Sequence, residues 1–461
     1  METIIKESIL YSDYIAIADD RDRKITYKEL ARRAKKLKSC MEERSLIFIL
    51  CDRQMETVEF LYEILYLNLV PLLLDDEIDG GLLDNLLALY RPQYIYGRKS
   101  RDIHGGYVIK AEWDQHVLLK TGNFPYEIHR DVAVLMSTSG TTGSAKLVKL
   151  SYGNLRSNAE QVSGCMDIRP GQKGLHSSSF GHVYGLAFYI WHWYCGATIL
   201  ITGEPMLSSK FGEFYTREKV NNLGSTPYGY QILRRIGFWT PARLEYLHWA
   251  MSGGAPMPES EQKNMVSYMG DKFWIGYGMT ETASALSCIN LKRENGKWGS
   301  VGRPLKDVRI VADSGTGELI VKSRSVCMGY AENSRQLADG DRNHGILHTG
   351  DVVEIDEDGY IYLKGRIKRY VNMLGKRVSL DEVEAYLKNQ YTGMEFACVG
   401  EENHITVFCA GKEKGLERYV PVLLDRVMKM PARLISCIAL EKLPRSSSGK
   451  TAYDRLTREL E

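Results

Sequence analysis

A run of hydroxyl-bearing residues and glycines is the first stretch of this chain whose residue types indicate chemistry. Glycine lets the backbone turn its N–H groups inward, hydroxyls add donors and a lysine adds a point charge, which suits nucleotide phosphates. An ordinary surface turn has a similar composition. A strand-like run at 132–136 leads directly into this loop. We predict phosphate contacts from Thr138, Ser139, Gly140, Thr141, Thr142, Gly143 and Lys146.

Two lysines in this chain invite comparison with P-loop NTPases, whose template is G-x-x-x-x-G-K-[ST]. The loop that ends at Lys146 would need glycine at 145 and serine or threonine at 147, where Ala145 and Leu147 stand. The loop that ends at Lys450 would need glycine at 444, where Pro444 stands. Neither loop is a Walker motif.

Three further segments carry groups that suit a nucleotide and a metal ion. Residues 277–281 read Y-G-M-T-E, and a hard cation prefers carboxylate oxygen while an aromatic face suits a purine. Taken alone, the threonine and glutamate of this segment would more simply cap a helix. A Gly-Asp turn at 350–351 and a solvated Lys450 are equally ordinary features by themselves. Their common order along one chain is what distinguishes them.

In that order these segments resemble the signatures of the adenylate-forming superfamily, which includes acyl- and aryl-CoA synthetases, adenylation domains of nonribosomal peptide synthetases and luciferases. The first loop is similar to T-S-G-T-T-G-x-P-K-G, 277–281 to Y-G-x-T-E, and 349–351 to T-G-D. Residues 444–450 are similar to P-R-T-x-S-G-K, and 365–384 to the hinge motif, with Lys368 and Arg369 in place of a frequent aspartate. Weaker matches extend the resemblance to nearly the whole chain.

The resemblance implies a site and a reaction. ATP and a carboxylic acid would give an acyl-adenylate and pyrophosphate, with Mg²⁺ held by Glu281, and a phosphopantetheine thiol of coenzyme A or of a carrier protein would then take the acyl group. The implied catalytic residues are Lys450, Thr280, Glu281 and His182. The implied nucleotide-binding residues, besides the first loop, are Gly254, Ala255, Pro256, Tyr277, Gly278, Asp351 and Arg366.

The segment around His182 favours an aryl or fatty acid as substrate. It resembles F-x-H-x-x-G-L, which lines the acyl pocket of CoA ligases, whereas amino-acid-activating domains place an aspartate near this point. The only acidic residue between Cys165 and Thr202 is Asp167, which is too far upstream. Two alternatives stay open: a standalone amino-acid adenylation enzyme and a non-catalytic nucleotide-binding relative. Nearby aromatic residues could line a pocket or pack the core: Tyr184, Tyr189, Trp191, Trp193, Tyr228 and Tyr230.

Composition excludes several other classes of function. A formal charge of +2 over 461 residues gives no field that would favour nucleic acid or an anionic membrane as the main partner. Nine scattered cysteines without a C-x-x-C pair indicate reduced thiols that mostly fill the core. The first residues lack a secretory pattern, so we expect a cytoplasmic protein. The apolar stretch 185–201 is too short to span a membrane and instead predicts a buried helix followed by a buried strand.

The spacing of apolar residues predicts an α/β fold with sheets covered by helices. Helices are expected over 26–37 and 56–69 and from Tyr152, and strands over 71–75, 132–136 and 197–201. After about residue 300, short strands and turns at 313–317 and 356–359 indicate a β-rich subdomain. We predict an N-terminal adenylating domain over 1–367 and a small α+β lid domain over 368–461 that carries the catalytic lysine.

Overall fold

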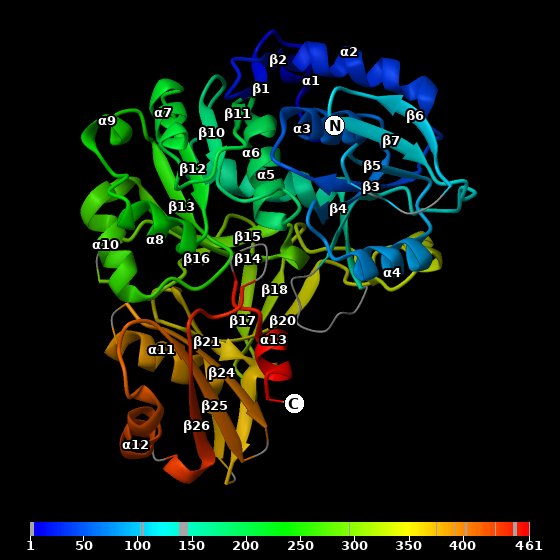
Figure 1. Cartoon of the computed structure of the whole chain (residues 1–461). Coiled ribbons are helices and arrows are strands. Elements are labelled where there is room, and N and C mark those ends of the chain that lie inside the picture. The colour runs from blue at the N-terminus through cyan, green and yellow to red at the C-terminus, as the bar shows by residue number, and fades with distance from the viewer. Residues whose placement is uncertain are drawn as a thin grey trace.

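The computed structural model describes residues 4–101, 103, 106–137, 146–294, 296–374, 376–391, 393–401, 403–428, 430–445 and 450–460. It confirms an α/β fold built on two large sheets with helices packed around them (Figure 1). The first sheet has nine strands in the order β16-β15-β14-β13-β12-β10-β11-β1-β2. Its strands are β1 (Ile15–Asp19), β2 (Lys24–Thr26), β10 (Lys173–His176), β11 (Thr198–Ile201), β12 (Asn222–Ser225), β13 (Trp249–Ser252), β14 (Phe273–Met279), β15 (Ser284–Ile289) and β16 (Arg303–Pro304).

The second large sheet has eight strands in the order β19-β9-β8-β4-β3-β5-β7-β6. Its central strands β3 and β4 are buried almost throughout, as expected for parallel strands covered on both faces. The strands are β3 (Leu46–Cys51), β4 (Val70–Asp75), β5 (Tyr94–Arg98), β6 (Val108–Glu112), β7 (His116–Lys120), β8 (Val132–Ser137), β9 (Leu147–Ser151) and β19 (Tyr330–Ala331).

Helices fall close to the predicted positions, and local chemistry sets their ends. The helix expected from Thr26 begins one residue later, because Thr26 is its N-cap: the Thr26 hydroxyl accepts from the Glu29 N–H and the Glu29 carboxylate accepts in return. In this part of the chain the helices are α1 (Glu7–Leu10), α2 (Tyr27–Leu37), α3 (Met55–Tyr66), α4 (Gly80–Tyr90), α5 (Tyr152–Met166), α6 (Val183–Cys195), α7 (Ser209–Arg217), α8 (Pro227–Arg235), α9 (Pro241–Leu244) and α10 (Glu259–Met269).

The apolar stretch 185–201 forms most of the buried helix α6 and then the buried strand β11, as predicted. Among the described residues, no helix is both long enough and apolar enough to cross a membrane.

The segment after residue 300 is rich in strands, and it also completes the two large sheets. β17 (Arg309–Ala312), β18 (Glu318–Lys322), β20 (Ile346–Ile355) and β21 (Ile361–Arg366) form an antiparallel sheet of their own. The turns expected at 313–317 and 356–359 connect two pairs of these strands. However, β16 joins the nine-stranded sheet and β19 joins the eight-stranded sheet, so the segment ties both sheets together.

The last 90 or so residues form a smaller α+β unit, seen in the lower part of Figure 1. Its core includes Val383, Phe396 and Val407, and its buried hydrophobic residues cluster among themselves. The unit contains β22 (Tyr370–Met373), β23 (Lys376–Ser379), α11 (Leu380–Gln390), β24 (Glu395–Glu401), β25 (His404–Ala410), α12 (Leu416–Met428), β26 (Ile435–Leu440) and α13 (Tyr453–Arg458). A domain boundary at 367/368 stays a prediction.

Candidate active site

The parallel strands of the nine-stranded sheet bring several predicted site residues to one edge. β10, β12, β13 and β14 run parallel as neighbours, so the loops at their carboxyl ends meet there, where open α/β sheets bind ligands. His182 follows β10, the turn at 254–256 follows β13, and Tyr277 and Gly278 lie near the end of β14. The sheet therefore positions residues that are almost 100 positions apart in sequence.

The predicted phosphate loop lies mostly outside the described residues. Thr138, Ser139, Gly140, Thr141, Thr142 and Gly143 belong to the segment 138–145 that is not described. Lys146 is described, and its Nζ lies 3.8 Å from the centroid of the Tyr330 ring. The Tyr330 hydroxyl in turn donates to Glu281 Oε1 at 2.9 Å. One tyrosine thus connects the lysine at the end of the loop with the predicted metal-binding carboxylate.

Glu281 sits on a tight turn between β14 and β15, in a short 3-10 helix over Thr280–Thr282. The Thr282 hydroxyl fixes this turn by donating to the carbonyl oxygen of Ser284 at 2.7 Å. Gly278 is required for the same hairpin, since an added Cβ would lie 1.7 Å from that carbonyl oxygen. Steric constraint in the hairpin therefore explains why position 278, shortly before the Thr-Glu pair, is a glycine.

Asp351 joins two other predicted nucleotide-binding residues. The Tyr277 hydroxyl donates to its Oδ2 at 2.6 Å, and Arg366 Nε donates to its Oδ1 at 2.8 Å. Asp351 is 4% exposed, so its charge is balanced by the guanidinium rather than by bulk water. Burial, together with the neighbouring Asp351 charge, raises the pKa of Tyr277 well above its usual range, and Tyr277 therefore stays a donor.

Lys450 comes from the far end of the chain into this cluster. In Figure 1 the red segment between β26 and α13 reaches up from the smaller unit toward β14 and β15. Burial lowers the pKa of Lys450; the nearby Arg366 lowers it further, while Glu281 raises it. Lys450 thus shares its surroundings with one cation and one anion of the predicted site.

His182 is also within electrostatic range of Lys450. Burial lowers the pKa of His182; the Asp75 carboxylate raises it, and the Lys450 charge lowers it. The imidazole is therefore neutral near pH 7. Its Nε2 atom is buried and has no hydrogen-bond partner among the described residues. A buried nitrogen of this kind is costly unless something else pairs with it.

One contact fastens the loop of Lys450 to the large unit. The Arg445 guanidinium lies 4.4 Å from the centroid of the Tyr228 ring, at the start of α8, and it also bonds Glu395 on β24 at 2.7 Å. Arg445 therefore links the smaller unit to the helix that follows β12, five residues before Lys450.

A family model described as AMP-binding enzyme matches residues 10–331, which is more than half of the chain. The chain belongs to the AMP-binding enzyme family. This confirms the resemblance to the adenylate-forming superfamily.

Curated relatives of this AMP-binding enzyme carry names of CoA ligases. The chain is 31% identical to a feruloyl-CoA synthase of Amycolatopsis sp over 283 residues, which cover 58% of this chain and 56% of that protein. It is 28% identical to a 2-succinylbenzoate–CoA ligase of Bacillus mycoides over 341 residues, 69% of this chain and 68% of the other. The chain thus matches little more than half the length of the feruloyl-CoA synthase.

Solved structures share the fold over almost the whole chain. ATP-bound MatB from Rhodopseudomonas palustris superposes with a TM-score of 0.78 at 21% identity and covers 97% of this chain and 96% of its own. O-succinylbenzoate coenzyme A synthetase from Bacillus subtilis, in complex with ATP and magnesium ion, gives 0.78 at 19% identity and 99% of both chains. These likenesses establish the fold.

Some predicted residues of this AMP-binding enzyme stand apart from the cluster. Gly254, Ala255 and Pro256 are exposed at the end of β13, where Gly254 has a φ of +82° that favours glycine. Thr280 is partly buried next to Glu281. Within the described part of the chain, no three His, Cys, Asp or Glu side chains gather to hold a metal ion. The roles of these residues stay predictions.

Two residues of the cluster, Tyr330 and Arg445, were not predicted as site residues, and Tyr228 was named only as an aromatic residue that could line a pocket or pack the core. Tyr330 lies 49 positions from Glu281, and Tyr228 lies more than 200 positions from Arg445, so no local spacing could pair them. Tyr330 and the glycine before it belong to one of the weaker matches to the family, and this match was the signal in the sequence that could have pointed to Tyr330.

Most of the aromatic residues near α6 pack the core. Five of them are at most 8% exposed: Tyr184, Tyr189, Trp191, Trp193 and Tyr230. Their polar groups are partly used internally, as when the Tyr184 hydroxyl donates to the Met251 carbonyl at 2.8 Å and Trp191 Nε1 donates to Asn158 at 2.9 Å. Tyr228 is only partly buried and contacts Arg445 instead.

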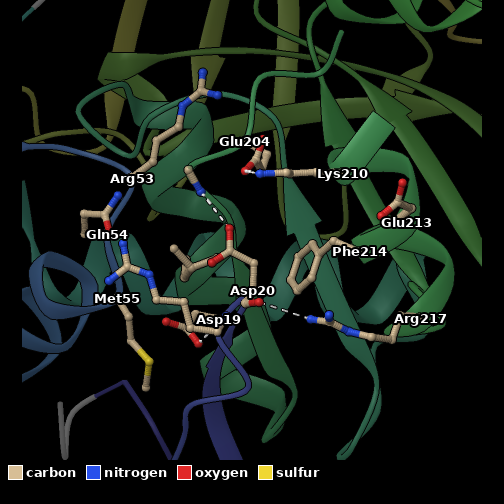
Figure 2. Close-up of a pocket in the computed structure, with 13 residues that line it drawn as sticks. Asp19, Asp20, Arg53, Gln54, Met55, Glu204, Lys210, Glu213, Phe214 and Arg217 are labelled. Atoms are coloured by element: carbon tan, nitrogen blue, oxygen red, sulfur yellow. Dashed lines mark hydrogen bonds and ion pairs between the residues drawn. The ribbon is translucent and has the colours of Figure 1, made fainter. Parts of the chain in front are cut away.

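A cavity of about 440 Å³ opens at another part of the same sheet edge, beyond the ends of β1 and β11 (Figure 2). Its walls carry many charges, but several are already compensated. Lys210 faces Glu204 at 3.8 Å, Arg217 donates to the Asp20 carbonyl at 3.3 Å, and the Asp20 carboxylate accepts from the Thr202 hydroxyl at 2.7 Å. None of the predicted site residues lines this cavity.

Proposed function

We propose that this chain activates a carboxylic acid with ATP to an acyl-adenylate, releases pyrophosphate, and transfers the acyl group to the phosphopantetheine thiol of coenzyme A. One observation carries the proposal. Lys450, from the last dozen residues, lies within electrostatic range of Glu281, Arg366 and His182, although more than 80 residues separate it from the nearest of these in sequence. Two anions must meet for adenylation, and a cation placed between them lowers the barrier to their approach.

In this proposal the residues mainly position the reactants and compensate their charge. Lys450 bridges the substrate carboxylate and the α-phosphate of ATP, and Lys146 with the preceding loop binds the departing pyrophosphate. Asp351 and Arg366 bind the ribose, with Tyr277 against the adenine. His182 Nε2, which lacks a partner among the described residues, pairs with the substrate acid at the entrance of the acyl pocket.

Magnesium fits the same arrangement. Mg²⁺ in nucleotide sites is held by one or two carboxylates together with substrate phosphates, so the Glu281 carboxylate suits it. The Tyr330 hydroxyl donates a hydrogen bond to Oε1 of Glu281 and so fixes the orientation of the carboxylate. When bound, the ion would neutralise charge on the phosphate oxygens.

The names of the relatives support an aryl or fatty acid. They include a feruloyl-CoA synthase, a 2-succinylbenzoate–CoA ligase and long-chain-fatty-acid–CoA ligases, whereas a non-ribosomal peptide synthetase matches at 26% identity. The absence of an acidic residue between Asp167 and Thr202 in the sequence points the same way. A carrier-protein arm presents the same thiol as coenzyme A, so it is kept as an alternative acceptor.

Pyrophosphate exchange into ATP tests the proposal directly. The acids to compare are ferulate, 2-succinylbenzoate, palmitate and phenylalanine, each with Mg²⁺ and then with coenzyme A to follow thiol loss. We expect an aryl or fatty acid to raise exchange by about tenfold or more over the acid-free background, since a matching acyl pocket is worth at least 1.4 kcal/mol. If phenylalanine alone supported exchange, the substrate would be an amino acid rather than an aryl or fatty acid. If no acid supported exchange although ATP binds, the chain would be a non-catalytic nucleotide-binding protein.

A further inference from the structure

Two cysteines outside the cluster lie unusually close together. Cys165 Sγ, near the end of α5, is 3.1 Å from Cys288 Sγ on β15, although 123 positions separate them in sequence. Cys165 is exposed and Cys288 is partly buried. The contact therefore combines a surface thiol that an oxidant can reach with a second thiol held directly behind it.

We propose that Cys165 and Cys288 form a reversible dithiol–disulfide pair that reacts with peroxides. The Cys165 thiolate attacks one oxygen of hydrogen peroxide, the O–O bond breaks, and a sulfenic acid and hydroxide result. The Cys288 thiol then attacks the Cys165 sulfur, and its proton leaves with the sulfenic hydroxyl as water. In total two thiols are oxidised and one peroxide is reduced to two waters.

The surroundings of the pair favour Cys165 as the attacking thiol. The hydrogen bond from Cys288 lowers the pKa of Cys165, and the positive charge of Arg293 lowers it further. The same bond, together with burial, raises the pKa of Cys288, which is therefore the donor of the two. An exposed thiolate backed by a protonated partner is the arrangement that a two-step oxidation requires.

The proposed disulfide would join two elements that follow predicted site segments in sequence. α5 begins shortly after the phosphate loop, and β15 follows the turn that carries Glu281. Asn158 on the same helix already binds this region, because its Nδ2 donates to the Ala285 carbonyl at 2.6 Å. The disulfide would add a second connection between α5 and β15, about two helical turns further along α5. It would also restrict the unfolded chain, because it closes a long loop.

The chain contains a natural comparison pair. Cys409 and Cys437, on the neighbouring strands β25 and β26, have their sulfurs 3.9 Å apart, and Cys409 is buried. Neither of these two thiols is exposed. The second pair should therefore react more slowly than Cys165 and Cys288 at the same peroxide concentration.

Peptide mapping of the full-length protein tests the proposal without any substrate, so the outcome is independent of the proposed function. After mild peroxide treatment and trypsin digestion without reductant, we expect peptide 157–173 linked to peptide 273–292, and separation of the two by dithiothreitol. The oxidised protein should also melt at a higher temperature than the reduced protein, because the loop is closed.

Cys165→Ser should remove both the linked peptide and the rise in melting temperature, whereas Cys409→Ser should keep both. Cys165 is exposed, so its replacement should not disturb the core; Cys288→Ala provides a second variant with the same expected loss. A sulfenic acid trapped at Cys165 by dimedone in the wild-type protein, with no linked peptide, would overturn the proposal, as would linkage that survives in Cys165→Ser.

Discussion

The cavity beside β1 and the cluster around Lys450, which we propose as the active site, differ in how their charged groups are compensated. In the cavity, charged side chains from the end of β1, from the loop after β3 and from α7 with the loop before it come together, and several compensate one another, as with Glu204 and Lys210. In the cluster, Glu281, Asp351 and Lys450 come from distant segments, and within the described part of the chain the buried Nε2 atom of His182 has no hydrogen-bond partner. Buried ionisable groups without such compensation are costly to fold, so the cluster is the better candidate for a functional site.

Among substitutions in the two regions, Lys450→Ala should lower pyrophosphate exchange the most. Removing a cation that stabilises charge in the transition state typically costs about 100- to 1000-fold, so pyrophosphate exchange should fall by at least about 100-fold. Thioester formation from a supplied acyl-adenylate should remain, because that step no longer joins two anions. Lys442→Ala is the matched control, since Lys442 is an exposed lysine of the same segment. Unchanged exchange in Lys450→Ala would refute the assignment of the cluster.

Asp351→Asn should have the second largest effect. The change keeps the shape of the side chain but removes the charge that Arg366 and Tyr277 bind. Hydrogen bonds to a charged group are worth about 1.5–3 kcal/mol, so the KM for ATP should rise by about tenfold or more. Steady-state exchange at varied ATP measures this, with Asp358→Asn, an exposed turn residue, as control. An unaltered KM would exclude Asp351 from nucleotide binding.

Arg445→Ala should have a smaller effect that depends on Tyr228. A cation–π contact contributes about 0.5–2 kcal/mol, so exchange should fall by about two- to thirtyfold. If the contact holds Lys450 in place, Tyr228→Leu should cause a similar loss, and the double variant should lose little more than either single one. Effects that simply multiply would show that the two residues act separately.

Lys210→Ala should have the smallest effect on pyrophosphate exchange, and it tests whether the cavity takes part in the reaction. Lys210 is exposed, and its pair with Glu204 spans 3.8 Å, which for a surface pair contributes about 0–1 kcal/mol. Exchange should stay within about twofold of wild type. A large drop in exchange, with an unchanged melting temperature, would show that the cavity takes part in the reaction.

Much of the fold could be predicted because burial leaves a local pattern. The α/β class, the helix after Thr26, the strand that ends in the phosphate loop and the buried helix α6 all follow from apolar spacing over a few residues. The role of β16 and β19 in completing the large sheets could not be predicted, because each is only two residues long and its partner strand is far away.

The site was predictable as a set of motifs but not as a geometry. Glu281, Asp351, Arg366 and Lys450 could be named from their residue types and order, and the structure places them near one another. The contacts that fix them depend on tertiary packing: no pattern in the sequence predicts that Tyr330 orients Glu281 or that Arg445 rests on Tyr228.

Arg369, which stands close to where the family often has an aspartate, determines how motion of the smaller unit could be observed. Its guanidinium bonds Asp381 and Glu384 at 2.6 Å each and lies 3.9 Å from the centroid of the Tyr453 ring. Two helices of the unit, α11 and α13, are thereby fastened to its first residues, so any movement of the unit should be that of one rigid piece. A fluorescent label anywhere on α11 would therefore report the position of the lysine-bearing loop in real time, without a label near the reaction itself.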